Sequence, residues 1–323
     1  MQQKQQFDKL QQYISGKIIG QSELVNRLLI AMLADGHLLV EGAPGLAKTR
    51  AIQVLSQAVE GDFHRVQFTP DLLPADITGT EIFQPQTGEF QFRKGPLFHN
   101  LVLADEINRA PAKVQSALLE AMAERQITVA GTTYPLSEPF MVMATQNPIE
   151  QEGTYHLPEA QLDRFLMHVK VGYPSLEAEQ QILHLNRAEA LQQIKHEVTE
   201  PAIQLSKDDI LAARQQVMQM YMAESVEQYL LQLVMATRQP EAYGDALTGV
   251  IAFGASPRAT MALDRCARAH AWLQGRDYVG PDDVQAIAHD VLRHRILLTF
   301  EGEAAGQTSD QVIDTLLSLV AVP

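Results

Sequence analysis

The chain has 323 residues, 46% of them hydrophobic and 20% charged, a length and composition that favour two globular domains. Its net charge of −14 argues against a surface built mainly to bind nucleic acid, and its single cysteine, Cys266, excludes an internal disulfide or a cysteine-rich zinc site. We find no apolar run long enough to span a bilayer and no signal-peptide layout at the N-terminus, so the expected compartment is the cytoplasm.

Two amphipathic helices are predicted before residue 36. Apolar side chains recur at helical spacing through residues 7–14 and again through residues 22–35, where Gly36 follows as a stop signal. A short apolar turn between the two helices contains Ile18 and Ile19.

A phosphate-binding loop is predicted where an apolar run, residues 37–41, gives way to a glycine-rich turn and then to a helical pattern. The residues of this turn and of the helix start are Gly42, Ala43, Pro44, Gly45, Leu46, Ala47, Lys48, Thr49 and Arg50. In such a loop, backbone N–H groups and the helix N-terminus converge on phosphates. Lys48 can then reach the β- and γ-phosphates, and the Thr49 hydroxyl can ligate Mg²⁺. Ala47 stands where the consensus has glycine, so a positive φ there would strain the backbone slightly.

Four further apolar runs are typical of strands: residues 64–68, 101–105, 140–145 and 166–171. Because these runs are apolar throughout, we expect a parallel sheet that is covered on both faces. Hairpin patterns near residues 80–95 and 126–136 interrupt the alternation of strands and helices.

The pattern changes after Pro174, from alternating strands and helices to helices alone. We therefore divide the chain into an αβα nucleotide-binding core, residues 1–175, and a smaller all-α domain, residues 176–323. The Ser-Pro-Arg sequence at residues 256–258 is typical of the start of a helix. The Arg-His-Arg sequence at residues 293–295 is predicted to lie in the last turn of another helix, where positive charge suits the helix dipole.

Two of the predicted strands end in polar residues that can take part in phosphate chemistry. Asp105 and Glu106 end the third apolar run, and Asn147 follows the fourth. Behind a phosphate-binding loop, Asp105 is expected to hold Mg²⁺ through water and Glu106 to orient the attacking water. Asn147 can touch the γ-phosphate or that water from a neighbouring strand. Each feature alone also fits a plainer interpretation, a solvated carboxylate pair or a common Asn-Pro turn.

The order of these motifs resembles that of AAA+ ATPases. Three longer stretches, residues 68–79, 105–111 and 157–165, are similar to the MoxR family, and the resemblance covers nearly the whole chain past residue 15. It implies a P-loop core with a five-stranded parallel sheet in the order 5-1-4-3-2, followed by an all-α lid domain. The two hairpins would be the helix-2 insert and the pre-sensor-1 insert of such proteins. Ala47 fits the resemblance as well, because this family often has alanine at that position of the loop.

The resemblance also implies roles for single residues. They are adenine contact for Ile18 and Ile19, Walker A for Lys48 and Thr49, Walker B for Asp105 and Glu106, sensor 1 for Asn147, sensor 2 for Arg258, and the arginine finger for Arg164. An arginine finger acts on the nucleotide of the neighbouring subunit, so hydrolysis would need a ring. The alternative for Arg164 is a salt bridge with Asp163 or Glu159 of its own chain. Whether Arg258 acts in cis or in trans, and whether Arg109 is an interface residue, stays open.

Three functions are compatible with the sequence. The MoxR resemblance implies an ATP-hydrolysing homo-oligomeric ring, expected to be a hexamer, that remodels, matures or inserts a cofactor into a client protein together with a von Willebrand factor A domain partner. An MCM-like nucleic-acid motor is the alternative from another class, but residues 80–95 and 126–136 offer only Arg93 and Lys94 as basic side chains. A regulatory ATP-binding module with little turnover would not need Glu106.

Overall fold

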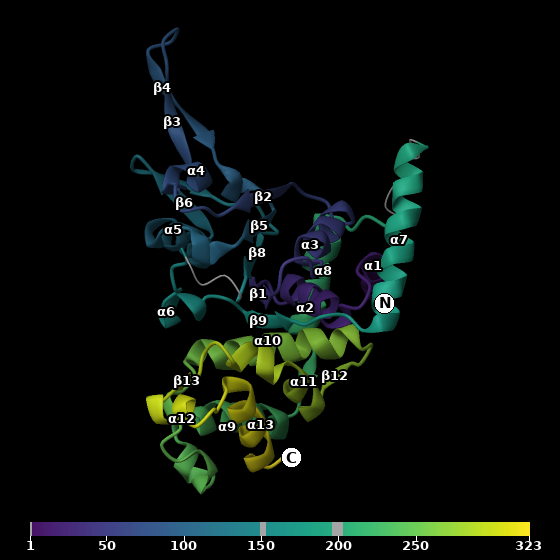
Figure 1. Cartoon of the computed structure of the whole chain (residues 1–323), viewed down its shortest axis with the longest axis vertical. Helices are drawn as coiled ribbons and strands as arrows, with labels where there is room; N and C mark the ends of the chain where they lie inside the picture. The colour runs from purple at the N-terminus through teal and green to yellow at the C-terminus, as the bar shows by residue number, and fades with distance from the viewer. Residues whose placement is uncertain (1, 149–152, 196–202) are drawn as a thin grey trace. The chain divides into compact units, whose positions relative to one another are not determined.

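The computed structural model describes residues 2–148, 153–195 and 203–323 (Figure 1). By its internal contacts the chain divides into two compact units. The first comprises Met1–Leu157 and Val169–Ala212, and the second comprises Pro158–His168 and Ala213–Pro323. The domain boundary near residue 175, which rests on the sequence pattern, stays a prediction.

Five parallel strands form the central sheet: β1 (Leu38–Gly42), β2 (Phe63–Gln67), β5 (Leu101–Asp105), β8 (Met141–Gln146) and β9 (Met167–Val171). Their order across the sheet is β2-β5-β8-β1-β9. Counted along these five strands, it is the predicted order 5-1-4-3-2, so that prediction is confirmed. Parallel strands end at the same edge of a sheet, so β1, β5 and β8 bring their polar carboxyl ends together.

Helices bury the sheet because their apolar stripes have the helical period. In α1 (Gln2–Lys17) the residues Phe7, Leu10 and Ile14 are fully buried, and α1 packs on α2 (Ser22–Leu33) and α3 (Lys48–Gln57). The predicted stripe after the third strand forms α5 (Ala112–Glu124), which packs against α4 (Pro74–Thr78). A long helix, α7 (Leu176–Ile194), begins shortly after β9. Both helices predicted before residue 36 are thus present, as α1 and α2, and the phosphate-binding loop leads into α3.

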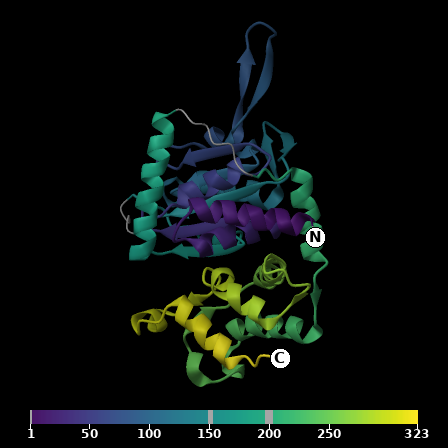
Figure 2. The same ribbon diagram turned by 90° about the vertical axis from the view of Figure 1, so that its right-hand side faces the viewer.

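The structure has a hairpin at each of the two places where the sequence predicts one. Strands β3 (Gly79–Gln84) and β4 (Glu89–Lys94) form the first, and β6 (Gln126–Val129) and β7 (Thr132–Pro135) form the second. Figures 1 and 2 both show the β3–β4 hairpin projecting beyond the sheet. Stacking of Phe92 on Tyr134, with ring centroids 4.3 Å apart, joins the two hairpins.

Helices dominate the second unit, as expected. They include α6 (Glu159–Leu162), α9 (Glu224–Arg238), α10 (Pro257–Leu273), α11 (Pro281–Leu292), α12 (Phe300–Ala304) and α13 (Ser309–Leu319), and Cys266 is a fully buried core residue of α10. Within the ranges that the structure describes, no helix combines the length and the apolarity needed to cross a membrane.

The helical lid domain is confirmed, and it also contains two short strand pairs that the sequence did not predict. Strand β10 (Tyr221–Met222) pairs in parallel with β12 (Tyr278–Val279), and β11 (Ile251–Phe253) pairs antiparallel with β13 (Leu297–Leu298). Strands of two or three residues are too short to produce a recognisable alternation of apolar and polar residues, which needs at least four.

Candidate nucleotide site

The phosphate-binding loop lies between the end of β1 and the start of α3. Gly42 is required because a Cβ atom there would lie 2.7 Å from the carbonyl oxygen of Val171. Gly45 and Ala47 both have positive φ, 82° and 58°, so the strain predicted for Ala47 is present. The N-cap residue of α3 is Ala47, whose methyl side chain has no oxygen to cap the helix. Its backbone N–H groups and its dipole can therefore meet an anion, as the sequence predicted.

The Lys48 ammonium is held at the carboxyl edge of the sheet. It donates a hydrogen bond to the carbonyl oxygen of Gly42 and lies 3.4 Å from that of Gln146. Burial lowers the pKa of Lys48, and the charges of Asp105, Glu106 and Glu41 offset part of this effect. A phosphate near Lys48 would stabilise the charged form further, since it places a full negative charge beside a partly buried cation.

Asp105 is buried and both of its carboxylate oxygens accept hydrogen bonds. Thr145 Oγ1 donates to Oδ1 over 2.6 Å, and Arg65 donates to Oδ2 from Nε and Nη2 over 3.1 and 2.6 Å. Carboxylate and hydroxyl oxygens are the ligands that Mg²⁺ prefers, so Asp105 and Thr49 fit a magnesium site. Sequence reasoning missed Thr145 and Arg65, because each lies within an ordinary strand pattern.

Glu106 occupies a left-handed backbone conformation with φ 57°. Its backbone N–H donates to Thr145 Oγ1 over 2.9 Å, so this one hydroxyl connects the two acidic residues. Its Oε2 accepts from Gln67 Nε2 over 2.7 Å and from Arg109 Nη1 over 3.1 Å. The structure therefore gives Arg109, whose role the sequence left open, a partner within its own chain.

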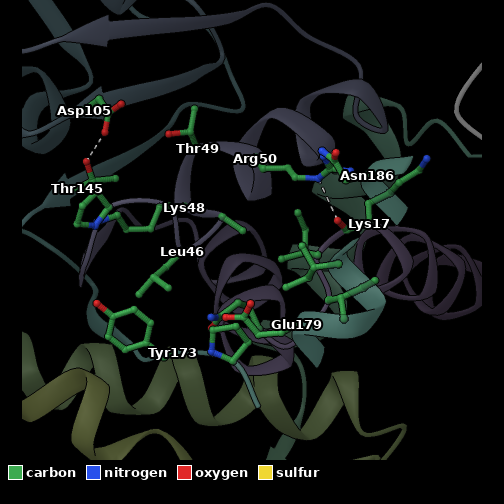
Figure 3. A pocket seen from close by; sticks show the side chains of 18 of the residues that line it. Lys17, Leu46, Lys48, Thr49, Arg50, Asp105, Thr145, Tyr173, Glu179 and Asn186 are labelled. Carbon is green, nitrogen blue, oxygen red and sulfur yellow. Dashed lines mark hydrogen bonds between the residues drawn. The ribbon is translucent and has the colours of Figure 1, made fainter. Parts of the chain in front are cut away.

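These groups line a pocket of about 670 Å³ within the first unit (Figure 3). Of the predicted binding residues, Ile18, Ile19, residues 44–50, Asp105, Glu106 and Asn147 line it, whereas Gly42 and Ala43 line a neighbouring hollow. The pocket thus has a polar end with the carboxylates and the loop. Apolar side chains, among them Ile18 and Ile19, also line it and suit a flat apolar ring such as a nucleobase.

Further lining residues were missed by sequence reasoning. They are Tyr173, Pro174 and four residues of α7 (Glu179, Ile182, Leu185 and Asn186), all of which line the same pocket. Figure 3 shows Arg50 turned toward Lys17, whose carbonyl oxygen accepts from Arg50 Nε over 3.1 Å. Arg50 Nη2 also lies 2.5 Å from Glu189 of α7. The Arg50 side chain thus ties the loop helix to α7.

Comparisons with known proteins agree with this geometry. Residues 37–167 match the family described as "ATPase family associated with various cellular activities (AAA)", and residues 248–316 match the AAA lid domain. The chain is 47% identical to Chaperone MoxR1 of Mycobacterium tuberculosis over 95% of its own length and 79% of that protein. It is 33% identical to Protein MoxR of Paracoccus denitrificans over 96% and 94% of the two chains. The chain belongs to the MoxR family of AAA+ ATPases.

A solved structure extends this likeness of the MoxR-family chain to the whole fold. The crystal structure of a Cytophaga hutchinsonii protein assigned as an ATPase superposes with a TM-score of 0.91 and 45% identity. The match covers 100% of this chain and 96% of that one.

The two arginines to which the MoxR resemblance gives roles both belong to the second unit. Arg164 follows α6, and Arg258 lies in the first turn of α10, where Ser256 Oγ accepts from its backbone N–H over 3.1 Å. Arg258 Nη1 lies 3.7 Å from Asp163 Oδ2. Asp163, the residue before Arg164, therefore links the two arginine positions.

Proposed function

We propose that this protein hydrolyses ATP in the pocket of the first unit and uses the energy to remodel, mature or insert a cofactor into a client protein. One observation carries the proposal. A phosphate-binding loop, the carboxylates Asp105 and Glu106, and the amide of Asn147 line the same pocket, which is large enough for a nucleotide. Family membership supports the same chemistry.

Each residue has a task in this reaction. Lys48 and the N-terminus of α3 neutralise the phosphates. When bound, Mg²⁺ neutralises developing phosphate charge, and the oxygens of Thr49 and Asp105 would hold it. Glu106 orients and polarises the attacking water, and its carboxylate has acceptor sites for that water besides the bonds that Oε2 takes from Gln67 and Arg109. Asn147 positions the water or the γ-phosphate from the end of β8.

The proposal includes assembly. We take the active form to be a homo-oligomeric ring, a hexamer, in which Arg164 of one subunit stabilises the transition state on the nucleotide of its neighbour. Arg258 acts as sensor 2. The partner carries a von Willebrand factor A domain, and the reaction takes place in the cytoplasm. The family resemblance supports these statements, which go beyond the pocket itself.

Binding and turnover should separate by residue. Lys48→Ala is expected to weaken ATP binding because it removes the cation that meets the phosphates. Glu106→Gln is expected to bind ATP well and to lower kcat by about 10²–10³-fold, since only activation of water is lost. Equilibrium binding of a fluorescent ATP analogue and phosphate release measure the two effects. Normal turnover in Glu106→Gln would remove Glu106 from the mechanism.

Mixed rings test the role of Arg164. Arg164→Ala is expected to lower kcat by up to about 10³-fold while ATP binding stays near wild type. Mixing Arg164→Ala with Lys48→Ala subunits should restore activity, because some interfaces then pair an intact loop with an intact arginine. No recovery in rings shown by cross-linking to contain both variants would contradict a role in trans.

Filter binding to single-stranded DNA at low and moderate salt separates this function from a nucleic-acid motor. The net charge of −14 and hairpins with only Arg93 and Lys94 as basic residues lead us to expect no retention at moderate salt. ATP-stimulated retention there would favour the motor.

A further inference from the structure

Three consecutive residues directly after α11 hold the chain segment that contains Arg164. Sequence analysis placed Arg293, His294 and Arg295 in the last turn of a helix, but α11 ends at Leu292. Each of the three side chains instead bonds to a backbone carbonyl group of residues 163–168, within the second unit. The interpretation as helix-dipole compensation was therefore incomplete.

Arg295 makes most of these bonds. It is buried, and all three of its nitrogens donate: Nε to Asp163 Oδ1 over 2.7 Å, Nη1 to the carbonyl oxygens of Leu166 and Val291 over 3.1 and 2.5 Å, and Nη2 to those of Phe165 and Asp163 over 2.6 and 3.3 Å. Only a guanidinium has enough donors in a fixed plane to do this. We call Asp163, Phe165, Leu166, His294 and Arg295 the Arg295 cluster.

His294 adds a second bond to the same peptide. Its Nε2 donates to the carbonyl oxygen of Phe165 over 3.2 Å. Arg293 donates to the carbonyl oxygen of His168 and also pairs with Asp290 and Asp310. Hydrogen bonds thus hold the backbone just after Arg164 and again where β9 begins.

Asp163 connects these hydrogen bonds to α10. Its Oδ2 accepts from Ser256 Oγ over 2.8 Å and lies 3.7 Å from Arg258 Nη1, while Oδ1 takes the bond from Arg295. The residue before Arg164 is therefore fixed by its side chain, and the residues after it are fixed by their carbonyl groups. Arg164 extends from a backbone that has little freedom.

We propose that Arg295 is a positioning residue for Arg164: it fixes the backbone from which Arg164 reaches the neighbouring subunit, so that finger and second unit move together. This rests on the proposed action of Arg164 in trans. Transition-state stabilisation depends on placement to a fraction of an ångström. A rigid attachment of this segment to α11 would supply that placement.

Arg295→Lys is the variant to test, because lysine keeps the charge but offers a single nitrogen. It is expected to lower kcat by about 10- to 10²-fold, because a misplacement of about 1 Å can cost 10²-fold in rate. ATP affinity should stay near wild type. The matched control is Arg276→Lys, since Arg276 also pairs with two aspartates of the second unit, and among the described residues its hydrogen bonds go to Asp282 and Asp283 rather than to residues 163–168. It should leave both quantities unchanged.

Mixed rings show where Arg295 acts. If it works through Arg164, Arg295→Lys subunits regain activity with Lys48→Ala subunits, which supply an intact finger, but not with Arg164→Ala subunits. Recovery with Arg164→Ala instead would mean that Arg295 serves its own subunit's nucleotide and would overturn the proposal. So would recovery with neither, or an unchanged kcat.

Two controls separate the possible failures. If Arg164→Ala and Lys48→Ala subunits themselves fail to complement, the trans role of Arg164 is wrong and the positioning role falls with it; if they complement, only the positioning role is at stake. Should Arg295→Lys not fold, Arg295→Met replaces it, because Asp163 would keep Ser256 and Arg258 as partners. The same pattern of complementation is expected.

Discussion

Asp105 in the nucleotide pocket and Asp163 in the Arg295 cluster have similar partners, an arginine and a hydroxyl, but differ in how they hold the arginine. The side chain of Arg65, which pairs with Asp105, is 47% exposed, whereas that of Arg295, which pairs with Asp163, is 3% exposed. Water can replace Asp105 around an exposed guanidinium at little cost, but it cannot reach Arg295. The pocket can thus exchange its cation, whereas the cluster keeps a fixed geometry.

The backbone differs in the same sense. Ala47 and Glu106 in the pocket have positive φ, and every non-glycine residue with positive φ in the described ranges lies in the first unit. Left-handed conformations of such residues are strained and persist at sites where geometry serves a function. The Arg295 cluster holds its geometry by several hydrogen bonds from one buried guanidinium instead, so the two regions should respond differently to substitution.

The largest effect on stability is expected from Asp163→Ala. It leaves the buried Arg295 guanidinium without its carboxylate, which should lower the free energy of unfolding by about 3–5 kcal/mol. Trp272, the single tryptophan, lies in α10 and reports unfolding of the second unit by fluorescence in urea. The control is Asp314→Ala, whose carboxylate is 69% exposed beside His289 and should contribute less than about 1 kcal/mol. Equal losses would erase the difference between a buried and an exposed pair.

Acid should also lower the stability of the fold through the Arg295 cluster. Burial, followed by the nearby charge of Arg295, holds the pKa of His294 well below its ordinary 6.5. Below pH 6.5 the unfolded chain therefore binds a proton that the folded chain does not, and stability falls as pH falls. The slope approaches the value for one proton, about 1.4 kcal/mol per pH unit. In His294→Gln, which keeps a donor for the carbonyl oxygen of Phe165, the unfolding free energy from urea titrations should depend less on pH. An unchanged pH dependence would exclude His294 as its source.

A smaller effect is expected at Asp105, where Arg65 and Mg²⁺ would compete for the same carboxylate. Removing the guanidinium in Arg65→Gln should lower the Mg²⁺ concentration for half-maximal nucleotide binding by about fivefold, the equivalent of roughly 1 kcal/mol, because the Arg65 side chain is exposed although Asp105 is buried. The control is Arg93→Gln, an exposed arginine of β4 that changes net charge equally. If Arg65→Gln instead needs more Mg²⁺, Arg65 orients Asp105 rather than competing for it.

Much of the pocket could be predicted because its residues follow one another along the chain. Lys48 and Thr49 come directly after a strand and a glycine-rich turn, and Asp105 and Glu106 end a strand, so local patterns carry the signal. The strand order came from the family resemblance. Thr145 and Arg65 could not be found this way, because only the order and register of β2, β5 and β8 place them beside Asp105.

The Arg295 cluster lay beyond such reasoning for a different reason. Arg295 and Asp163 are 132 positions apart, and nothing near either residue indicates the other. The basic residues after α11 have a local interpretation in the helix dipole, which concealed the long-range one. Ile182 and Leu185 also could not be predicted as pocket residues. They lie in α7, far along the chain from the loop, and α7 has no clear apolar stripe.

The smallest predicted effect concerns the strain at Ala47. Ala47→Gly should relieve the left-handed conformation, worth about 1–2 kcal/mol, and lose about 0.5–1 kcal/mol to the greater freedom of glycine in the unfolded chain. A net gain in unfolding free energy of roughly 0–1.5 kcal/mol, centred below about 1 kcal/mol, should follow, measured by circular dichroism in urea. The control is Ala130→Gly at the β6–β7 turn, where φ is 49°. Both variants should gain stability alike. Only Ala47→Gly should weaken ATP binding, because the glycine loosens the loop whose N–H groups meet the phosphates. If both bind ATP as tightly as wild type, the strain at Ala47 has no part in holding the loop ready for nucleotide.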